Sequence, residues 1–401
     1  MLTDPRIRDL EGMMRCIHCN TPMPEGQRLC PACGGRQEAR SGANLYQRLS
    51  HEVEADHSRW RREWTVPEAV LTPEWGEALA PSVVEPVSAL DAKVDGRLNL
   101  LLLHAGFSPF RSLRVAVDSE AGAASLDYRS RPGAIQGREI PIAPRSGTVE
   151  PPALAPDLDI FEDLDEAVQG TLEVTLRVEG QEMARKGYQV TVQPSNEWVD
   201  QPGAAASLAG AVTPNSTPVV GLAASLEGNF MAYQAPESRR REELAAVYNA
   251  LGKLGLHYVN VPPSFEGTGQ KVLFPDQVLQ RRQGCCLDIA LLEASLLERL
   301  GYRPLILFLR DQQRGGGHAL CGVWTQDVLA HETVLFDRAI LDPMVESGDL
   351  ELWNSTSRFE GEADFEAARA AGRTWMQHFA YALDLGACRR AGIKPLSRRR
   401  S

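Results

Sequence analysis

The sequence lacks a long apolar run, an excess of basic residues and an apolar N-terminal segment. The longest apolar runs, such as Leu305–Leu309, are far shorter than the roughly 20 residues that a membrane-spanning helix needs. Asp and Glu outnumber Lys and Arg by 53 to 42, which argues against nonspecific binding to a nucleic-acid backbone. The opening residues, MLTDPRIRDLEG, carry charges where a secretion signal would be apolar. We therefore expect a cytoplasmic protein with no membrane partner.

Length and composition set limits on the architecture. A chain of 401 residues, 43% of them apolar, is long enough for two or three domains that each bury a core. Its 34 Gly and 26 Pro residues are close to average usage, which excludes the collagen-like and wholly disordered classes. We expect a multidomain protein without internal repeats.

The eight cysteines fall into two groups, and without a secretion signal neither group is expected to form disulfides. Four of them, Cys16, Cys19, Cys30 and Cys33, form two Cys-x2-Cys pairs near the N-terminus. Each pair can place two thiolates on one tight turn, and four thiolates form the tetrahedral shell that zinc prefers. We therefore predict a minimal zinc ribbon over residues 1–42, with a structural Zn2+ on which its folding depends. The pattern does not decide whether this ribbon binds a protein or a nucleic acid.

The next two regions are predicted to be a linker and an all-β module. Residues 43–90 combine alternating charges with a Pro-spaced stretch, which is typical of a helical connector. Within residues 91–195 the apolar period becomes two, most clearly over Thr171–Val178. Several short strands without a helical period between them predict an Ig-like antiparallel β-sandwich. No strand presents a convergent set of catalytic residue types, so we expect a spacer or an interaction domain.

The helical period returns in residues 196–401, for which we predict an α+β domain. Glycines close two of its helical patterns, and a short apolar run after the second helix is typical of a buried strand. The predicted elements are the helices Glu242–Leu254, Cys286–Leu300 and Phe365–Ala391 and the strands Leu305–Leu309 and His318–Trp324.

A cysteine pair stands at the start of the second of these helices. A thiol there meets the positive end of the helix dipole, which favours the thiolate, and the free backbone N–H groups can hold an oxyanion. His318 opens a later strand, directly after three glycines. A cysteine at a helix start and a histidine on a neighbouring strand are the first two members of a Cys-His-acid catalytic set. Spacing alone does not separate Cys285 from Cys286, and it leaves open that both thiols are inert and the histidine structural.

Several segments of residues 196–401 follow the order Gly-x-Cys-x-Asp, helix, strand, Gly-His-Ala and strand. This order resembles the transglutaminase-like fold, which includes many microbial cysteine peptidases. The region is more specifically similar to a transglutaminase-like region of large bacterial proteins that also carry helicase and nuclease domains. The β-rich segment before it also looks like the upstream module of that family. The matching segments are residues 196–198, 258–266, 268–272, 286–292, 317–319, 322–324 and 389–396.

The resemblance implies catalytic residues and leaves the third member of the set open. Its register makes Cys286 the nucleophile, because that cysteine lies two residues before Asp288, and it makes His318 the base. Asp342 matches the Leu-Asp-Pro signature of ordinary transglutaminase-like domains, whereas Asn354 stands where the helicase-linked family has an acid. An Asn can orient the imidazole but supplies no charge to stabilise the imidazolium, so we keep both and lean toward Asp342.

The leading hypothesis is a cysteine peptidase or acyltransferase that acts on a protein amide through a thioester. Hydrolysis is favoured over crosslinking because nothing in the sequence marks a dedicated amine site. The resemblance suggests a place in a bacterial defence system. Two alternatives stay open. One is a catalytically inactive transglutaminase-like binding module, and the other is an adaptor that binds protein or nucleic acid through its zinc ribbon.

Overall fold

The structure is a computed structural model, and it divides into two compact units. The first unit comprises Met1–Thr65 and the second Val66–Ser401. The structure describes residues 13–15, 22–24, 89–117, 122–143, 145, 147–199, 204–226, 230–260, 269–311, 316–326, 335–359 and 364–397.

Two short strands form an antiparallel pair in the first unit. Strand β1 (Met13–Arg15) lies beside β2 (Pro22–Pro24), with Met14 opposite Met23. The sequence between the two strands contains the first predicted cysteine pair. All four predicted zinc ligands, Cys16, Cys19, Cys30 and Cys33, lie outside the described residues.

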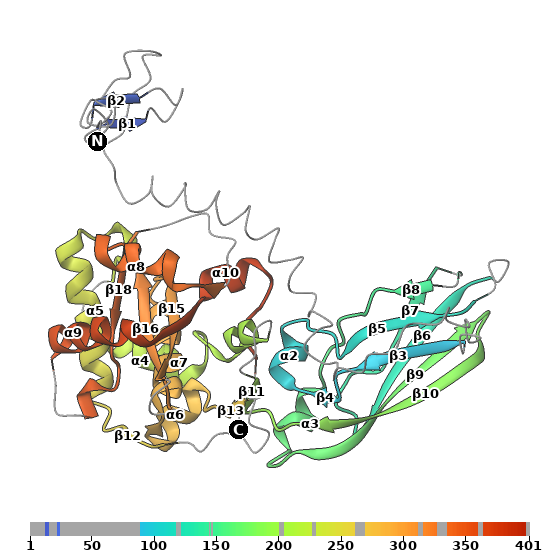
Figure 1. The fold of residues 1–401 in the computed structure, drawn as a ribbon. Helices are drawn as coiled ribbons and strands as arrows, with labels where there is room; N and C mark the ends of the chain where they lie inside the picture. The colour runs from blue at the N-terminus through green and yellow to red at the C-terminus, as the bar shows by residue number, and fades with distance from the viewer. Residues whose placement is uncertain are drawn as a thin grey trace. The chain divides into compact units, whose positions relative to one another are not determined.

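The second unit begins with a module built from two β-sheets (Figure 1). A five-stranded sheet has the order β4-β10-β9-β6-β7, and a three-stranded sheet has the order β3-β5-β8. Every pairing is antiparallel except that of β10 with β4. The elements are β3 (Leu90–Val94), β4 (Arg97–Leu98), α2 (Leu100–His104), β5 (Phe110–Val115), β6 (Ala124–Arg131), β7 (Arg138–Ile142), β8 (Gly147–Val149), α3 (Leu158–Glu162), β9 (Val168–Val178) and β10 (Gln181–Val192).

Alternation of apolar residues explains how these strands share a core. Leu172, Val174 and Leu176 of β9 are fully buried, as the period-two pattern of this segment predicts. The rings of Phe110 on β5 and Tyr128 on β6 pack with centroids 5.5 Å apart. Because β5 and β6 belong to different sheets, this contact shows that the two sheets bury apolar side chains together.

The second module contains a five-stranded antiparallel sheet of order β17-β19-β15-β16-β18, together with helices and two short strand pairs. Its elements are β11 (Glu197–Val199), η3 (Ala205–Ala211), α4 (Thr217–Ser225), η4 (Ala232–Gln234), α5 (Glu237–Gly252), β12 (His257–Tyr258), β13 (Gly269–Lys271), α6 (Pro275–Arg281), β14 (Gln283–Gly284), α7 (Cys286–Arg299), β15 (Pro304–Asp311), β16 (Gly316–Trp324), β17 (Leu335–Phe336), α8 (Arg338–Ser347), β18 (Leu350–Trp353), η5 (Ser357–Phe359), α9 (Phe365–Trp375), η6 (Met376–His378), β19 (Phe379–Asp384) and α10 (Leu385–Arg390).

Helix α7 is the central helix of this module. Every residue from Leu287 to Leu297 is buried, which is expected of a helix that is packed on all sides. It packs against strands β15 and β16 and against helices α4, α5 and α6. Among the described residues, no helix combines the length and the apolar character needed to cross a membrane.

The sequence pattern is wrong about the last predicted helix, Phe365–Ala391. Helix α9 ends at Trp375, and β19 (Phe379–Asp384) then enters the sheet between β17 and β15. A new helix, α10, begins only after Asp384, whose side chain accepts the Ala387 N–H at 2.8 Å. Pairing with β15 gives this segment a hydrogen-bonded place in the sheet, and such tertiary pairing overrides a local helical pattern.

Gly372 of α9 provides a test of how tightly this helix packs on β18. A Cβ at Gly372 would lie 2.8 Å from Leu352 Cδ1 and 2.9 Å from Trp353 Cα. The main chain of β18 has little freedom to move away because it is paired with β16. We predict that Gly372→Ala lowers the free energy of unfolding by about 1–3 kcal/mol, measured by urea denaturation.

Gly221 of α4 is the matched control, since a Cβ there meets no atom within 4 Å. Gly221→Ala should leave the free energy of unfolding unchanged or raise it by up to about 1 kcal/mol, because alanine favours a helix. Equal losses in the two variants would contradict the close packing of α9 on β18.

Candidate active site

The first turn of α7 is fixed by a buried carboxylate. Cys285 is the N-cap residue, and Cys286 is the first residue of the helix. Asp288 accepts the Cys285 N–H at 2.9 Å through Oδ2 and the Leu273 N–H at 2.7 Å through Oδ1. Burial raises the pKa of this carboxyl group, which is fully buried. Asp288 therefore holds the turn that carries both thiols.

His318 reaches the same place from the sheet. It lies on β16, and the pairing of β16 with β18 brings the end of β18 beside it, with Cys321 opposite Trp353. Asn354 directly follows β18, and its Oδ1 lies 2.9 Å from His318 Nε2. The Asn354 side chain is almost fully buried, so this hydrogen bond is shielded from water.

The partners of Asn354 decide which nitrogen of His318 carries the proton. Asn354 Oδ1 also lies 3.1 Å from the Thr356 N and 2.8 Å from Thr356 Oγ1. A backbone N–H can only donate, so the atom that faces it must be the amide oxygen. His318 Nε2 must then donate to that oxygen, and in the neutral ring Nδ1 is the unprotonated nitrogen. His318 thus keeps Nδ1 available as a base.

The Cys286 thiol is the acidic thiol of this site. The pKa of Cys286 lies well below its usual range, first because the Cys285 thiol donates a hydrogen bond to its sulfur, and next because the His318 ring hydrogen-bonds it and adds a positive charge. The same contact between the two thiols, together with burial, raises the pKa of Cys285. The contact between the two thiols therefore favours loss of the proton from Cys286 over loss from Cys285.

The remaining described thiols are poor candidates. Cys321 and Cys388 are fully buried, and burial raises the pKa of each. Cys286 is only partly buried, so a reagent can reach it.

Asp342 lies on another part of the fold. It stands on α8, where its Oδ2 accepts a hydrogen bond from Arg338 Nε at 2.8 Å, and its side chain is 38% exposed. The structure thus brings Cys286, His318 and Asn354 together, and it pairs Asp342 with an arginine one helical turn earlier.

Two aromatic residues border the site, and sequence reasoning gave neither a functional role. The Trp375 ring lies 4.8 Å from the His318 ring between centroids. Burial, the negative charge of a Cys286 thiolate and a hydrogen bond with its side chain raise the pKa of Tyr258, which adjoins the sulfur. Tyr258 reaches this position because β12 pairs with β14 in parallel, with Tyr258 opposite Gly284. Two-residue strands leave no periodic signal, so the sequence could not show this pairing.

Gln270 also lies at the site. Its Nε2 is 3.2 Å from the Cys285 sulfur. The side-chain amide is therefore engaged with the neighbouring thiol, one residue before the candidate nucleophile.

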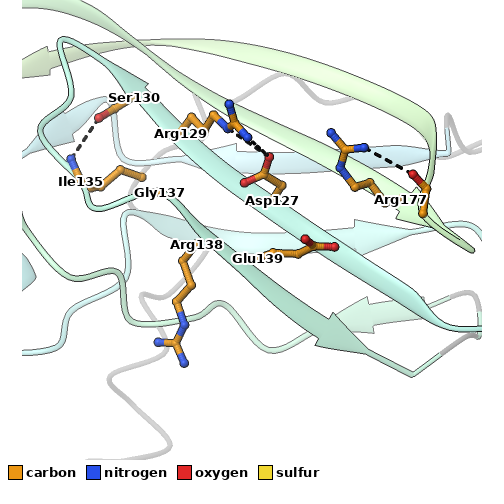
Figure 2. Close-up of a pocket in the computed structure, with 9 residues that line it drawn as sticks. Asp127, Arg129, Ser130, Ile135, Gly137, Arg138, Glu139 and Arg177 are labelled. Atoms are coloured by element: carbon orange, nitrogen blue, oxygen red, sulfur yellow. Dashed lines mark hydrogen bonds and ion pairs between the residues drawn. The ribbon is translucent and has the colours of Figure 1, made fainter.

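A separate hollow of about 650 Å³ lies on the β module, over β6, β7 and β9 (Figure 2). Its charged side chains largely pair with neighbours. Arg129 contacts Asp127 at 3.0 Å, and Arg177 donates to the Gly180 carbonyl at 3.4 Å. The hollow contains no cysteine or histidine. Within the part of the chain that the structure describes, no three His, Cys, Asp or Glu side chains gather as metal ligands.

Comparison with known proteins adds no family assignment. No family model matches the chain, and no curated protein matches it. A solved structure from Cytophaga hutchinsonii, described as a "Putative Cysteine Protease", aligns over 52% of this chain and 64% of its own, with 12% identity and a TM-score of 0.15. The alignment therefore spans less than two thirds of that protein. A likeness this low carries no argument about the fold or activity of this chain.

The lowered pKa of Cys286 predicts the pH dependence of its alkylation. Iodoacetamide should modify Cys286 faster than Cys388 at about pH 7, where an ordinary thiol with a pKa near 8.5 is mostly protonated. The rate at Cys286 should fall only when the pH drops through its lowered pKa. In His318→Ala this fall should move to higher pH, with about a tenfold loss of rate at low pH for each unit of the shift.

Peptide mass mapping of the alkylated protein measures both rates. Cys388→Ala is the control, and it should leave the rate at Cys286 unchanged. Equal rates at Cys286 and Cys388, or no change in His318→Ala, would count against an activated thiolate.

Proposed function

We propose that residues 196–401 form a cysteine acyl-transfer enzyme with Cys286 as nucleophile, His318 as general base and Asn354 as the residue that orients His318. The observation that carries the proposal is the hydrogen bond of 2.9 Å between His318 Nε2 and Asn354 Oδ1. It occupies Nε2 and leaves Nδ1 for the thiol at the start of α7. A nucleophile, a base and a group that holds the base in one tautomer are the parts that such catalysis requires.

The chemistry begins with proton transfer from Cys286 to His318 Nδ1. The thiolate then attacks the carbonyl carbon of an amide, and negative charge develops on the carbonyl oxygen. The backbone N–H groups of the first turn of α7 adjoin the sulfur and lack an acceptor within the helix, so they are the groups that can stabilise this charge. The C–N bond breaks, the imidazolium gives its proton to the departing amine, and a thioester remains on Cys286.

The second half of the reaction releases the acyl group. Water attacks the thioester carbonyl while His318 takes its proton, and the C–S bond breaks to leave a carboxylic acid and free Cys286. We favour water over a lysine amine because no dedicated amine site is marked. The proposed substrate is therefore a protein amide, and the reaction class is that of a cysteine peptidase.

Asn354 supplies orientation rather than charge. Its amide oxygen is held by both donors of Thr356, which prevents the side chain from turning its NH₂ group toward His318. The thiolate itself balances the charge of the imidazolium, and the Trp375 ring packs against the imidazole at a tilt of 42°. A neutral amide is thus sufficient for this third position.

The wider assignment follows the sequence resemblance. We propose a transglutaminase-like domain preceded by an Ig-like β-sandwich and a zinc ribbon, in a cytoplasmic protein of a bacterial defence system. The ribbon and the β-sandwich would then bind a protein partner or, for the ribbon, a nucleic acid.

The ribbon proposal rests on the donor set. Four cysteines in two Cys-x2-Cys pairs offer the all-thiolate shell that zinc prefers, and strands β1 and β2 flank the first pair in the sequence. Cys16, Cys19, Cys30 and Cys33 would hold the ion, which would supply folding free energy to this unit.

Metal analysis of the purified full chain tests the ribbon. We expect about one zinc ion per chain, and we expect Cys16→Ser and Cys30→Ser each to lose it, because the thiolate shell is then incomplete. Cys388→Ala removes a cysteine from the second group and should retain the metal. A zinc-free chain in which all four cysteines of the first group react quickly with a thiol reagent would contradict the ribbon.

Acylation by p-nitrophenyl acetate tests the catalytic proposal. The wild-type chain should release a burst of p-nitrophenolate and carry an acetyl thioester on Cys286, and Cys286→Ala should do neither. Asn354→Ala should acylate at least about tenfold more slowly, because His318 loses its fixed tautomer. Asn354→Asp keeps an acceptor for Nε2 and should retain most of the rate.

Asp342→Asn is the matched control for the third position. Its ion pair with Arg338 is exposed and contributes little, so acylation should stay within about twofold of wild type. A large loss in Asp342→Asn with none in Asn354→Ala would reverse the assignment. Added methylamine distinguishes hydrolysis of the thioester from crosslinking. If methylamine attacks the thioester in place of water and is incorporated into the product, crosslinking is favoured. Absence of any thioester would leave the binding module as the better account.

A further inference from the structure

The loop that carries Asn354 needs an anchor, because a catalytic hydrogen bond is useful only if its acceptor is held in place. Asn354 follows β18, and its own N–H bonds the Ala368 carbonyl of α9 at 2.9 Å. That single contact fixes the backbone at one point. The side chains on either side of Asn354 provide the rest.

Glu293 gathers these neighbouring side chains. Its Oε2 accepts a hydrogen bond from Trp353 Nε1 at 3.1 Å and another from the Ser355 hydroxyl. Its Oε1 accepts one from Arg358 Nη2 at 2.7 Å. Trp353 and Ser355 are the residues immediately before and after Asn354. One carboxylate therefore holds the chain on both sides of the amide that contacts His318.

Arg358 extends the same anchor to the loop backbone and to α5. Its Nε lies 2.8 Å from the Ser355 carbonyl, and its Nη1 lies 3.0 Å from the Tyr248 carbonyl. The guanidinium also sits over the Tyr248 ring, 4.0 Å from the centroid. The loop is thus bonded to both α5 and α7.

The position of Glu293 on α7 links the anchor to the nucleophile. Residues seven apart lie about two turns apart on the same face of a helix, and Glu293 is the seventh residue after Cys286. Helix α7 is buried from Leu287 to Leu297, so the thiol and the anchor of the Asn354 loop lie on the same packed helix. The next residues of the loop carry Phe359, whose ring packs 5.9 Å from the ring of Tyr258 beside Cys286.

The burial of this ion pair argues that its role is geometric. The Glu293 side chain is 0% exposed and that of Arg358 is 6% exposed. Removing two charges from water is costly, and apolar side chains of similar volume often stabilise a core as well or better. Buried pairs of this kind are best attested where they fix one arrangement among several.

We propose that Glu293 and Arg358 are a pair of positioning residues that lock Asn354 against His318 and thereby fix the imidazole tautomer that faces Cys286. This inference rests on the proposed catalytic function. Neither residue touches the reacting atoms, and both act through the loop between β18 and α9.

Glu293→Gln in the full chain tests the pair. The Gln side chain keeps the shape of Glu293 but has an NH₂ group in place of one carboxylate oxygen. An NH₂ group cannot accept a hydrogen bond, so Arg358 or one of the other donors to Glu293 loses its acceptor. Two readouts follow: the pH of half-maximal alkylation of Cys286 by iodoacetamide, and the nitrogen NMR shifts of His318, which report its tautomer. We expect the half-point to rise by at least about one pH unit, a tenfold loss of rate at low pH, and the Nε2–H tautomer to lose its dominance.

Glu298→Gln is the matched control on the same helix. Glu298 pairs with Arg389 through two contacts of 2.9 Å, and Arg389 also donates to main-chain carbonyls, so the chemistry is the same but Asn354 is not involved. This variant should lower the unfolding temperature while leaving the half-point and the His318 tautomer as in wild type. Equal shifts in both variants, or a wild-type half-point and tautomer in Glu293→Gln, would overturn the proposal.

Arg358→Lys is the second variant for this test, to be used if Glu293→Gln does not fold. Lysine keeps the charge beside Glu293 but loses the planar fork that reaches Ser355 and Tyr248. We expect a partial shift of both readouts, and no shift would overturn the proposal.

The proposed catalytic function and the positioning role of Glu293 and Arg358 can be distinguished by which readout fails. An ordinary half-point in wild type would reject the catalytic function, whereas the His318 tautomer still reports whether the pair holds the loop.

Discussion

The side-chain oxygen of Asn354 accepts hydrogen bonds from three donors, and the arrangement of the site depends on that atom. Two of the donors belong to Thr356, and they orient the amide so that its oxygen faces the third donor, His318. In the neutral imidazole the proton is then on Nε2, and Nδ1 is the basic nitrogen. Such a base can take the proton of a cysteine at a helix start, where the helix terminus also favours the thiolate.

Buried carboxylates maintain this arrangement at three points of the second module. Asp288 ties the first turn of α7 to the segment between β13 and α6, and Glu293 ties the Asn354 loop to the same helix. Asp384 accepts from Trp324 Nε1 at 2.8 Å and so ties β16 to the start of α10. Burial raises the pKa of all three carboxyl groups. Each is satisfied by several donors, which is the condition under which such groups are tolerated in a core.

The sequence predicted the local parts of this site better than their assembly. Helix α7 begins at Cys286, as its apolar pattern indicated, and it ends close to the glycine that was expected to stop it. His318 lies on the strand predicted for it. Both signals are local: one is a helical period, and the other is a short apolar run after glycines. The boundary errors are small where the period is strong, as at the C-terminus of α7.

The third position could not be chosen from the sequence because it depends on strand register. Asp342-Pro343 has the composition of a turn, yet the structure places it within α8, and only the pairing of β16 with β18 brings Asn354 to His318. Tyr258 and Glu293 were missed for the same reason, since their contacts join segments distant in the chain. The segment after Trp375 is a further case. A helix was predicted there, but pairing with β15 places the segment in the sheet.

The most direct test of this account is the ultraviolet absorbance of the thiolate as a function of pH, taken as the difference between wild type and Cys286→Ala. The thiolate should persist well below the ordinary thiol pKa of about 8.5, and its titration should shift to higher pH in His318→Ala. A thiolate that forms only at or above the ordinary range, with no effect of His318, would contradict it.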